Sequence, residues 1–171
     1  QAVVWRGPMA SKALHQLINE TAWPELDYLI VDMPPGTGDI QLTMAQQVPL
    51  SGAVVVTTPQ DLALADAIKG IAMFNKVGIP VLGLVENMSY HQCSQCGHKE
   101  AIFSEHGGDK LSEKYNLPLL GKLPLNIDIR QHADSGKPLQ ISNPEHALSD
   151  TYRQLARQTA KYCYLKSVEV A

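Results

Sequence analysis

The sequence predicts an α/β protein with a doubly wound, mostly parallel sheet. Short apolar runs rich in β-branched residues alternate with longer stretches of helical periodicity, which is typical of β–α units. The apolar runs are nearly continuous rather than alternating, so helices are expected on both faces of the sheet. The predicted strands are residues 3–5, 28–32, 53–57, 81–85 and 119–122.

Two helices are expected in the first half of the chain, one before the second predicted strand and one after the third. The first covers residues 10–21 and is ended by Trp23 and Pro24. The second covers residues 61–77, and the glycine and proline that follow it stop the helix. Its spacing of apolar side chains gives it one buried face, made by Leu64, Ile68 and Ile71.

Two further helices are expected in the second half of the chain. A short one covers residues 107–115, and Asn116 is a suitable left-handed residue at its end. The last helix is predicted to begin at Asn143 and Pro144, as N-cap and first helical residue. Its apolar stripe is made by Leu148, Tyr152, Leu155 and Thr159.

Composition narrows the possible classes of protein. With 171 residues, 44% of them hydrophobic, the chain is large enough for one domain with a true core. The net charge is −3 and no basic run occurs, so neither nucleic acid nor membrane is expected as a partner. Three cysteines are too few for a disulfide framework. No apolar stretch approaches the length of about 18 residues that spans a membrane, and the N-terminus does not have the build of a signal peptide, so a cytoplasmic location is expected.

The chain begins with Gln1, directly before an apolar run that predicts a buried strand. We therefore expect residues 1–165 to be part of a single domain and residues 166–171 to be a tail. Residues 89–105 form a polar segment rich in Cys, His and Gln, inserted between a strand and a helix. Loops at the carboxyl ends of parallel strands hold the functional groups in such folds.

An acidic residue ends the second predicted strand. Asp32 follows the apolar run Leu-Ile-Val and precedes Met-Pro-Pro-Gly-Thr-Gly-Asp. An aspartate at this position commonly holds Mg²⁺ in nucleotide-hydrolysing folds, and the Gly36 amide could donate to a γ-phosphate. Asp32 could instead only cap a turn, with an ordinary proline–glycine loop after it. The combination of these residues at one strand end favours the phosphate-side interpretation.

A complete phosphate site also needs the run GxxxxGK followed by Ser or Thr, and the sequence has none. Gly136 and Lys137 come nearest, but Pro138 replaces the hydroxyl residue and would break the helix that should begin there. The sequence therefore contains half of an ATP site.

Cys93 and Cys96 are the most informative pair in the sequence. Two thiolates three positions apart can bind one face of a soft metal ion or of an iron–sulfur cluster. Gly97 allows a positive φ, so that backbone N–H groups can point at sulfur. A tetrahedral site or a cubane cluster needs four ligands, and the only other cysteine, Cys163, lies in the last predicted helix.

Three interpretations of the cysteine pair remain open. A thioredoxin-like redox pair would need a helix N-terminus directly after a strand, which Gly97 disfavours. A zinc site would recruit two of three histidines: His91, His98 and His106. A cluster bound by four cysteines across a two-fold axis explains why only two cysteines are present, and we favour it.

Four segments occur in an order that resembles one family. They are WRGP at 5–8, LDYLIVDMPPGTGDIQLT at 26–43, TTPQDLALADA at 57–67 and VENMSY..C..CG at 85–97. This order resembles the Mrp/ApbC family of iron–sulfur cluster carrier ATPases, which are MinD-like deviant P-loop NTPases. The resemblance extends to about residue 160. It implies a homodimer that carries a labile [4Fe–4S] cluster to apo-proteins, with transfer driven by ATP and Mg²⁺.

The resemblance also implies roles for individual residues. Asp32 matches the Mg²⁺-side acid, Cys93 and Cys96 match the cluster ligands, and Asn87 matches the adenine-recognising position. Taken alone, Asn87 would more simply cap a turn. The family's glycine-rich P-loop half has no counterpart here, so we expect the C-terminal portion of such an ATPase, incomplete in its fold and inactive by itself.

Two other functions are alternatives. One is a zinc-stabilised binding module without enzymatic activity. The other is a MinD-type partitioning ATPase, which would need an amphipathic membrane-binding helix at its end. Residues 161–171 are short and mixed in character, which disfavours that function.

Overall fold

A computed structural model describes residues 7–33, 38, 41–42, 45–46, 48–93 and 95–169 of the chain. The predicted strand at residues 3–5 and the predicted phosphate-sensing residue Gly36 lie outside the described residues. The helices are α1 (Gly7–Asn19), α3 (Asp61–Lys76), α4 (Gly107–Tyr115), α5 (Ile127–Asp134), α6 (Leu139–Ser142) and α7 (Ala147–Glu169). The strands are β1 (Ala53–Thr57), β2 (Val81–Glu86), β3 (His91–Gln92), β4 (Lys99–Glu100) and β5 (Leu119–Lys122).

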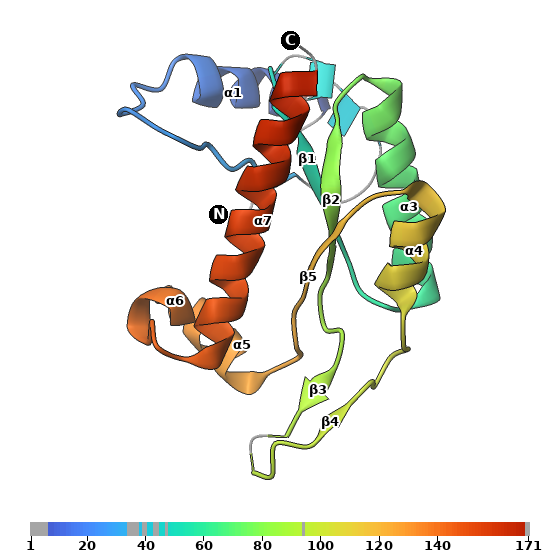
Figure 1. Cartoon of the computed structure of the whole chain (residues 1–171). Coiled ribbons are helices and arrows are strands. Elements are labelled where there is room, and N and C mark those ends of the chain that lie inside the picture. Colours follow the sequence, from blue (N-terminus) through green and yellow to red (C-terminus); the bar gives the residue numbers. More distant parts are fainter. Residues whose placement is uncertain are drawn as a thin grey trace.

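Three of the strands form a parallel sheet in the order β1-β2-β5. The helices α3 and α4 cover one face of this sheet, and α7 crosses the other (Figure 1). The predicted α/β fold with a parallel sheet covered on both faces is therefore confirmed. Parallel strands place their carboxyl ends at one edge, where Thr57, Glu86 and Lys122 lie in register.

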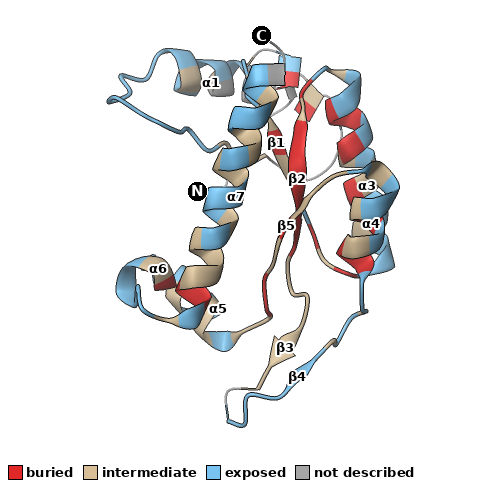
Figure 2. Ribbon diagram, viewed as in Figure 1, coloured by how far each residue is buried: buried red, intermediate tan, exposed pale blue. Residues whose placement is uncertain are grey.

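The central strand β2 is the most enclosed element. All six of its residues are buried, and Leu84 has no exposed surface (Figure 2). On one face Leu84 packs with Ile71 of α3 and Leu111 of α4, and on the other Val85 packs with Tyr152 and Leu155 of α7. A strand covered on both faces explains the unbroken apolar run in the sequence.

The predicted end signals of two helices are confirmed. Asn116 follows α4 in the left-handed conformation, with φ of 50°, and its N–H donates to the carbonyl groups of Ser112 and Glu113. Helix α3 ends at Lys76, and Gly78 takes a φ of 73°, which glycine adopts without strain. The predicted α3 face is also confirmed, because Leu64, Ile68 and Ile71 pack in the larger core cluster.

The prediction for the start of the last helix is wrong by a few residues. Helix α6 ends at Ser142 with Asn143 as its C-cap, and α7 begins at Ala147. The capping group is the ring of His146, whose Nδ1 accepts a hydrogen bond from Leu148 N–H at 3.1 Å. A histidine ring nitrogen thus takes the position that sequence preference gives to the asparagine side chain.

The predicted strand at residues 28–32 is also wrong for the described structure. These residues form no regular element, and Tyr28 and Ile30 are 62% and 83% exposed. A strand needs a neighbour to pair its backbone groups, and the described sheet provides no such neighbour for this segment. Among the described helices, none combines the length and apolar character needed to cross a membrane.

Candidate functional site: a cysteine turn at the carboxyl edge of the sheet

The inserted segment projects from the carboxyl edge of the sheet. It leaves β2, runs out and back as the short antiparallel pair β3–β4, and rejoins the fold at α4 (Figure 1). The segment is fixed along its first part to the chain after β5. Ser89 N–H donates to Leu123 O, and Leu125 N–H donates to Tyr90 O, at 2.9 and 2.8 Å. The hairpin therefore has an anchored base and a projecting tip.

The tip of the hairpin is a tight turn around the cysteine pair. Cys93 N–H donates to His98 O, and Gly97 N–H donates to Cys93 O, both at 2.9 Å. Gly97 has a φ of 72°, which confirms the prediction that this glycine takes a positive φ. Cys93 is half-buried and Cys96 is exposed, and both are free thiols.

The turn aims backbone N–H groups at the first sulfur. The N–H of Cys96, followed by that of Gln95 and by the Cys96 thiol, lowers the pKa of the Cys93 thiol. Desolvation and the negative charge of Glu100 act in the opposite direction and are outweighed. The turn therefore favours the thiolate form of Cys93, which is the form that binds soft metals, and the ligand role of Cys93 stays a prediction.

Two of the three histidines that a zinc site could recruit contact carboxylates. His106 Nδ1 lies 3.2 Å from Asp109 Oδ2, and His91 Nδ1 lies 3.3 Å from Glu100 Oε1. Within the described part of the chain, no three His, Cys, Asp or Glu side chains are grouped as a metal site. The pair also lies in a turn between two strands and not at a helix N-terminus, which disfavours the thioredoxin-like interpretation.

Asn87 lies at the base of the same segment. Its backbone N–H donates to Thr57 O at 2.7 Å, which ties it to the end of β1. Its side-chain Oδ1 accepts a hydrogen bond from Met88 N–H at 3.0 Å, and Met88 has a φ of 53°. The side chain thus caps a turn in this structure, and its role toward adenine stays a prediction.

Of the two predicted phosphate-side residues, only Asp32 belongs to the described residues. Asp32 is exposed at the end of a segment without regular secondary structure. Since Gly36 lies outside the described residues, the arrangement of these two residues stays a prediction as well.

Sequence reasoning missed Glu86. This residue ends β2 and is only 1% exposed, and its carboxylate accepts hydrogen bonds from Ser89 Oγ and from the backbone N–H of Gly108. A signal was present in the sequence, because an acid that ends an apolar strand needs buried partners. The adjacent glycines Gly107 and Gly108 mark where another segment could approach it closely.

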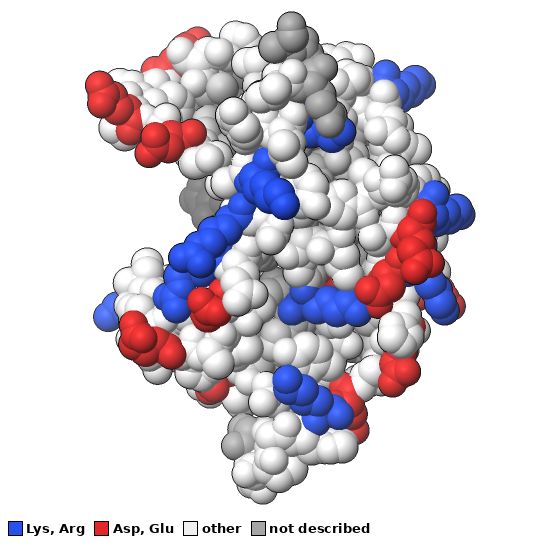
Figure 3. Space-filling model, in the orientation of Figure 1, with Lys and Arg blue, Asp and Glu red and all other residues white. Residues whose placement is uncertain are grey.

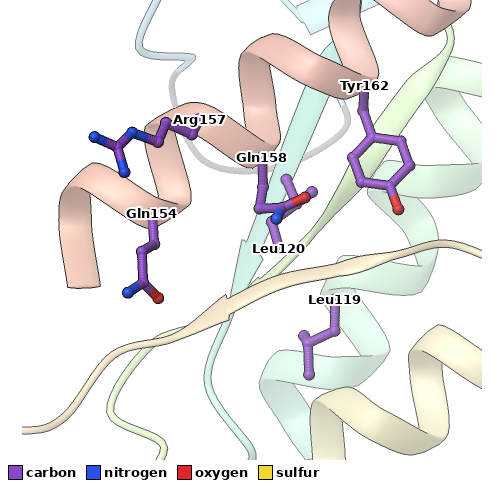
Figure 4. Close-up of a pocket in the computed structure, with 6 residues that line it drawn as sticks. All are labelled: Leu119, Leu120, Gln154, Arg157, Gln158 and Tyr162. Carbon is purple, nitrogen blue, oxygen red and sulfur yellow. The ribbon is translucent and has the colours of Figure 1, made fainter. Parts of the chain in front are cut away.

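A cavity of about 500 Å³ lies away from this edge, between β5 and α7 (Figure 4). It is lined by Leu119, Leu120, Gln154, Arg157, Gln158 and Tyr162. None of these is a predicted site residue.

On the face shown in Figure 3, acidic and basic side chains both occur, with basic groups along α7.

The fold is shared with nucleotide-binding proteins of known structure. A nucleotide-binding protein from Archaeoglobus fulgidus, solved in complex with ADP, superposes with a TM-score of 0.70 and 36% sequence identity. That match covers 81% of this chain and 56% of the other. The cell division ATPase MinD from Pyrococcus furiosus gives a TM-score of 0.66 at 23% identity, over 94% of this chain and 63% of the other, and shows the fold alone.

These matches define a MinD-like α/β fold. A family model described as "ParA: NUBPL iron-transfer P-loop NTPase" matches residues 1–160, and the chain belongs to this family. It is 63% identical to the "Iron-sulfur cluster carrier protein" of Escherichia coli K12, over 95% of this chain and 44% of the relative. It is 48% identical to the "Iron-sulfur cluster transfer protein NUBPL" of Mus musculus, over 93% of this chain and 50% of the relative. The chain thus spans about half the length of the curated relatives it matches, and the predicted resemblance to cluster carriers is confirmed.

Proposed function

We propose that this chain is the cluster-holding part of an ATP-dependent iron–sulfur cluster carrier. The observation that carries the proposal is the Cys93–Gly97 turn, in which two backbone N–H groups lower the pKa of the Cys93 thiol. Hydrogen bonds of this kind stabilise thiolate ligands of iron–sulfur clusters. The names of the relatives, which are cluster carrier and cluster transfer proteins, support the same cargo.

The cargo we propose is a [4Fe–4S] cluster shared by two copies of the chain. One chain offers Cys93 and Cys96, and a cubane cluster takes four thiolates. A two-fold axis beside the hairpin tip would bring two such pairs together, because a symmetric dimer presents each surface patch twice. The tip projects from the body of the fold, which makes this approach sterically simple (Figure 1). Apo-proteins that need a cluster are the proposed recipients, and the proposed location is the reducing cytoplasm.

We further propose that Mg²⁺–ATP drives the transfer. The Archaeoglobus protein, with 36% identity, was solved with ADP, which supports nucleotide binding by the same fold. In this chain Asp32 would hold the Mg²⁺ through water, Gly36 would sense the γ-phosphate, and Asn87 would meet the adenine. A complete site also needs a phosphate-cradling lysine loop, which residues 1–171 do not contain and which another segment or chain would have to supply.

Anaerobic reconstitution tests the proposed cargo. The full-length protein is incubated with ferrous iron and sulfide, and the visible absorption, the iron and sulfide content and the size of the complex are measured. We expect one cluster per two chains, formed together with a dimer. Cys93→Ser and Cys96→Ala should each abolish loading while leaving nucleotide affinity unchanged.

Cys163→Ser is the matched control. Cys163 is half-buried on α7, whose C-terminal end lies at the opposite end of the fold from the hairpin (Figure 1), and its replacement should leave loading unchanged. Stoichiometric zinc in place of a cluster, with loss of zinc in His106→Ala, would support the zinc module instead. A cluster bound by a monomer would contradict the shared site.

A further inference from the structure

The buried carboxylate of Glu86 contacts the chain at both ends of the inserted segment at residues 89–105. Glu86 Oε1 accepts a hydrogen bond from Ser89 Oγ at 2.5 Å, and Glu86 Oε2 accepts one from Gly108 N–H. Ser89 lies where the segment leaves β2, and Gly108 lies in the first turn of α4, where the segment ends. The side chain of one residue therefore closes a loop whose far end is the Cys93–Gly97 turn.

The first turn of α4 fits closely against Glu86 at the end of β2 and against Pro59, which follows β1. A Cβ on Gly108 would lie 2.8 Å from Glu86 Oε2, and a Cβ on Gly107 would lie 2.8 Å from Pro59 Cα. Distances this short leave no room for a side chain at either glycine. The two glycines thus let the helix N-terminus reach the Glu86 carboxylate.

Glu86 is itself held rigidly. It pairs with Thr57 of β1 and Lys122 of β5, and its carbonyl accepts Leu123 N–H at 2.9 Å. The positive end of the α4 dipole stabilises its carboxylate. Residues packed behind a metal ligand set the geometry of that ligand. A strand end that is paired on both edges therefore supports a ligand-bearing loop better than the loop's own backbone does.

We infer that Glu86 is a positioning residue for the cluster thiolates. It fixes both ends of the inserted segment at residues 89–105 and so slows loss of the cluster held by Cys93 and Cys96. The inference rests on the proposed cluster-carrying function. It assigns a role to the one acid of the described chain that is almost fully buried. Glu86 touches no cluster atom in this role and acts through Ser89 and Gly108.

Cluster lifetime in two Glu86 variants tests the inference. The full-length protein is reconstituted anaerobically, and the rate of cluster loss to a ferrous-iron chelator is measured. Glu86→Ala removes both hydrogen bonds and should speed the loss about tenfold or more. Glu86→Gln should behave as wild type, because its carbonyl can accept from Gly108 N–H while its amide donates to Ser89 Oγ.

Glu113→Ala is the matched control, since Glu113 is an exposed residue of the same helix α4. Thermal unfolding of every variant separates a loss of fold from a loss of cluster. Where Glu86→Ala fails to fold, Ser89→Ala removes only the bond at the hairpin side and should also speed cluster loss. Equal rates of loss in wild type, Glu86→Ala and Ser89→Ala would overturn the inference.

Amide hydrogen exchange gives a readout that needs no cluster. The amides of Cys93 and Gly97 should exchange faster in Glu86→Ala than in wild type, while the amides of β2 stay protected. Unchanged exchange at the turn would overturn the positioning role. A wild-type protein that takes up no cluster would overturn the proposed function, and the exchange rates would still decide whether Glu86 orders the turn.

Discussion

Two apolar runs that each end in an acid differ in strand pairing and in burial in this molecule. Residues 81–86 form β2, which pairs on both edges, is covered on both faces and ends in the buried Glu86. Residues 28–32 have a similar pattern, yet Ile30 is 83% exposed and Asp32 lies at the surface. An apolar β-branched run is therefore not sufficient for a strand, because pairing partners and covering helices complete it.

Truncation of one aliphatic side chain in each run should give the largest contrast. Leu84→Ala removes a side chain with no exposed surface and should lower the free energy of unfolding by about 3 kcal/mol. Ile30→Ala should change it by no more than about 0.5 kcal/mol, because the side chain is already largely in water. Urea unfolding followed by circular dichroism measures both.

The effect of Ile30→Ala also tests whether residues 28–32 are exposed in the protein under assay. A loss at Ile30 as large as that at Leu84 would show that residues 28–32 are buried in the protein under assay, as the strand prediction requires. The N-terminal segment would then have to be paired by chain outside the described residues.

A second pair of variants tests how tightly the sheet itself is packed. A Cβ on Gly83 of β2 would lie 2.6 Å from the backbone oxygen of Pro118, whereas one on Gly121 of β5 would lie 3.7 Å from Leu155 Cδ1. Gly83→Ala should therefore cost about 2 kcal/mol, and Gly121→Ala should cost less than about 1 kcal/mol. The shift in the urea midpoint at constant slope measures both costs, and equal shifts would contradict the difference in packing.

The elements that sequence patterns predicted well are those whose signals are local. Strands β1 and β5 and helix α4 have the predicted bounds, since apolar runs, flanking glycines and a left-handed Asn116 act over a few residues. The strand at 28–32 depended on neighbours distant in the sequence. The start of α7 depended on His146, whose ring is not a usual N-cap group.

In the candidate site, too, the feature with a local signal could be predicted and the feature that depends on distant residues could not. The positive φ of Gly97 could be predicted, because few other residues take that conformation without strain. The role of Glu86 could not, since its partners Ser89 and Gly108 stand on either side of a long insertion. Only the folded chain shows that an acid at the strand end and a glycine pair at the helix start are in contact.

The smallest expected effect concerns an ion pair at the same edge of the sheet. Asp109 of α4 accepts a hydrogen bond from Lys122 Nζ of β5 at 2.6 Å, and each side chain is about one-third exposed, at 35% and 36%. This hydrogen bond, aided by His106, holds the pKa of the Asp109 carboxyl below its usual value, against a smaller opposing effect of burial. The exposed pair of Asp66 and Lys69 on α3 is the natural comparison, with a similar contact of 2.9 Å in open solvent.

Asp109→Asn should therefore lower stability at neutral pH by about 1 kcal/mol or less, because solvent screens a partly exposed pair. The folded state binds the Asp109 proton more weakly than the unfolded state, so the stabilisation is fully present above the usual carboxyl pKa. It is lost as the pH falls through the lowered folded-state pKa, and wild type and Asp109→Asn should converge in acid. Asp66→Asn should show almost no effect at neutral pH, since fully solvated pairs contribute little. Urea unfolding of the three proteins over a pH series measures these free energies of unfolding. If the difference between wild type and Asp109→Asn stays constant into acid, the pair does not stabilise the α4–β5 contact through its charge.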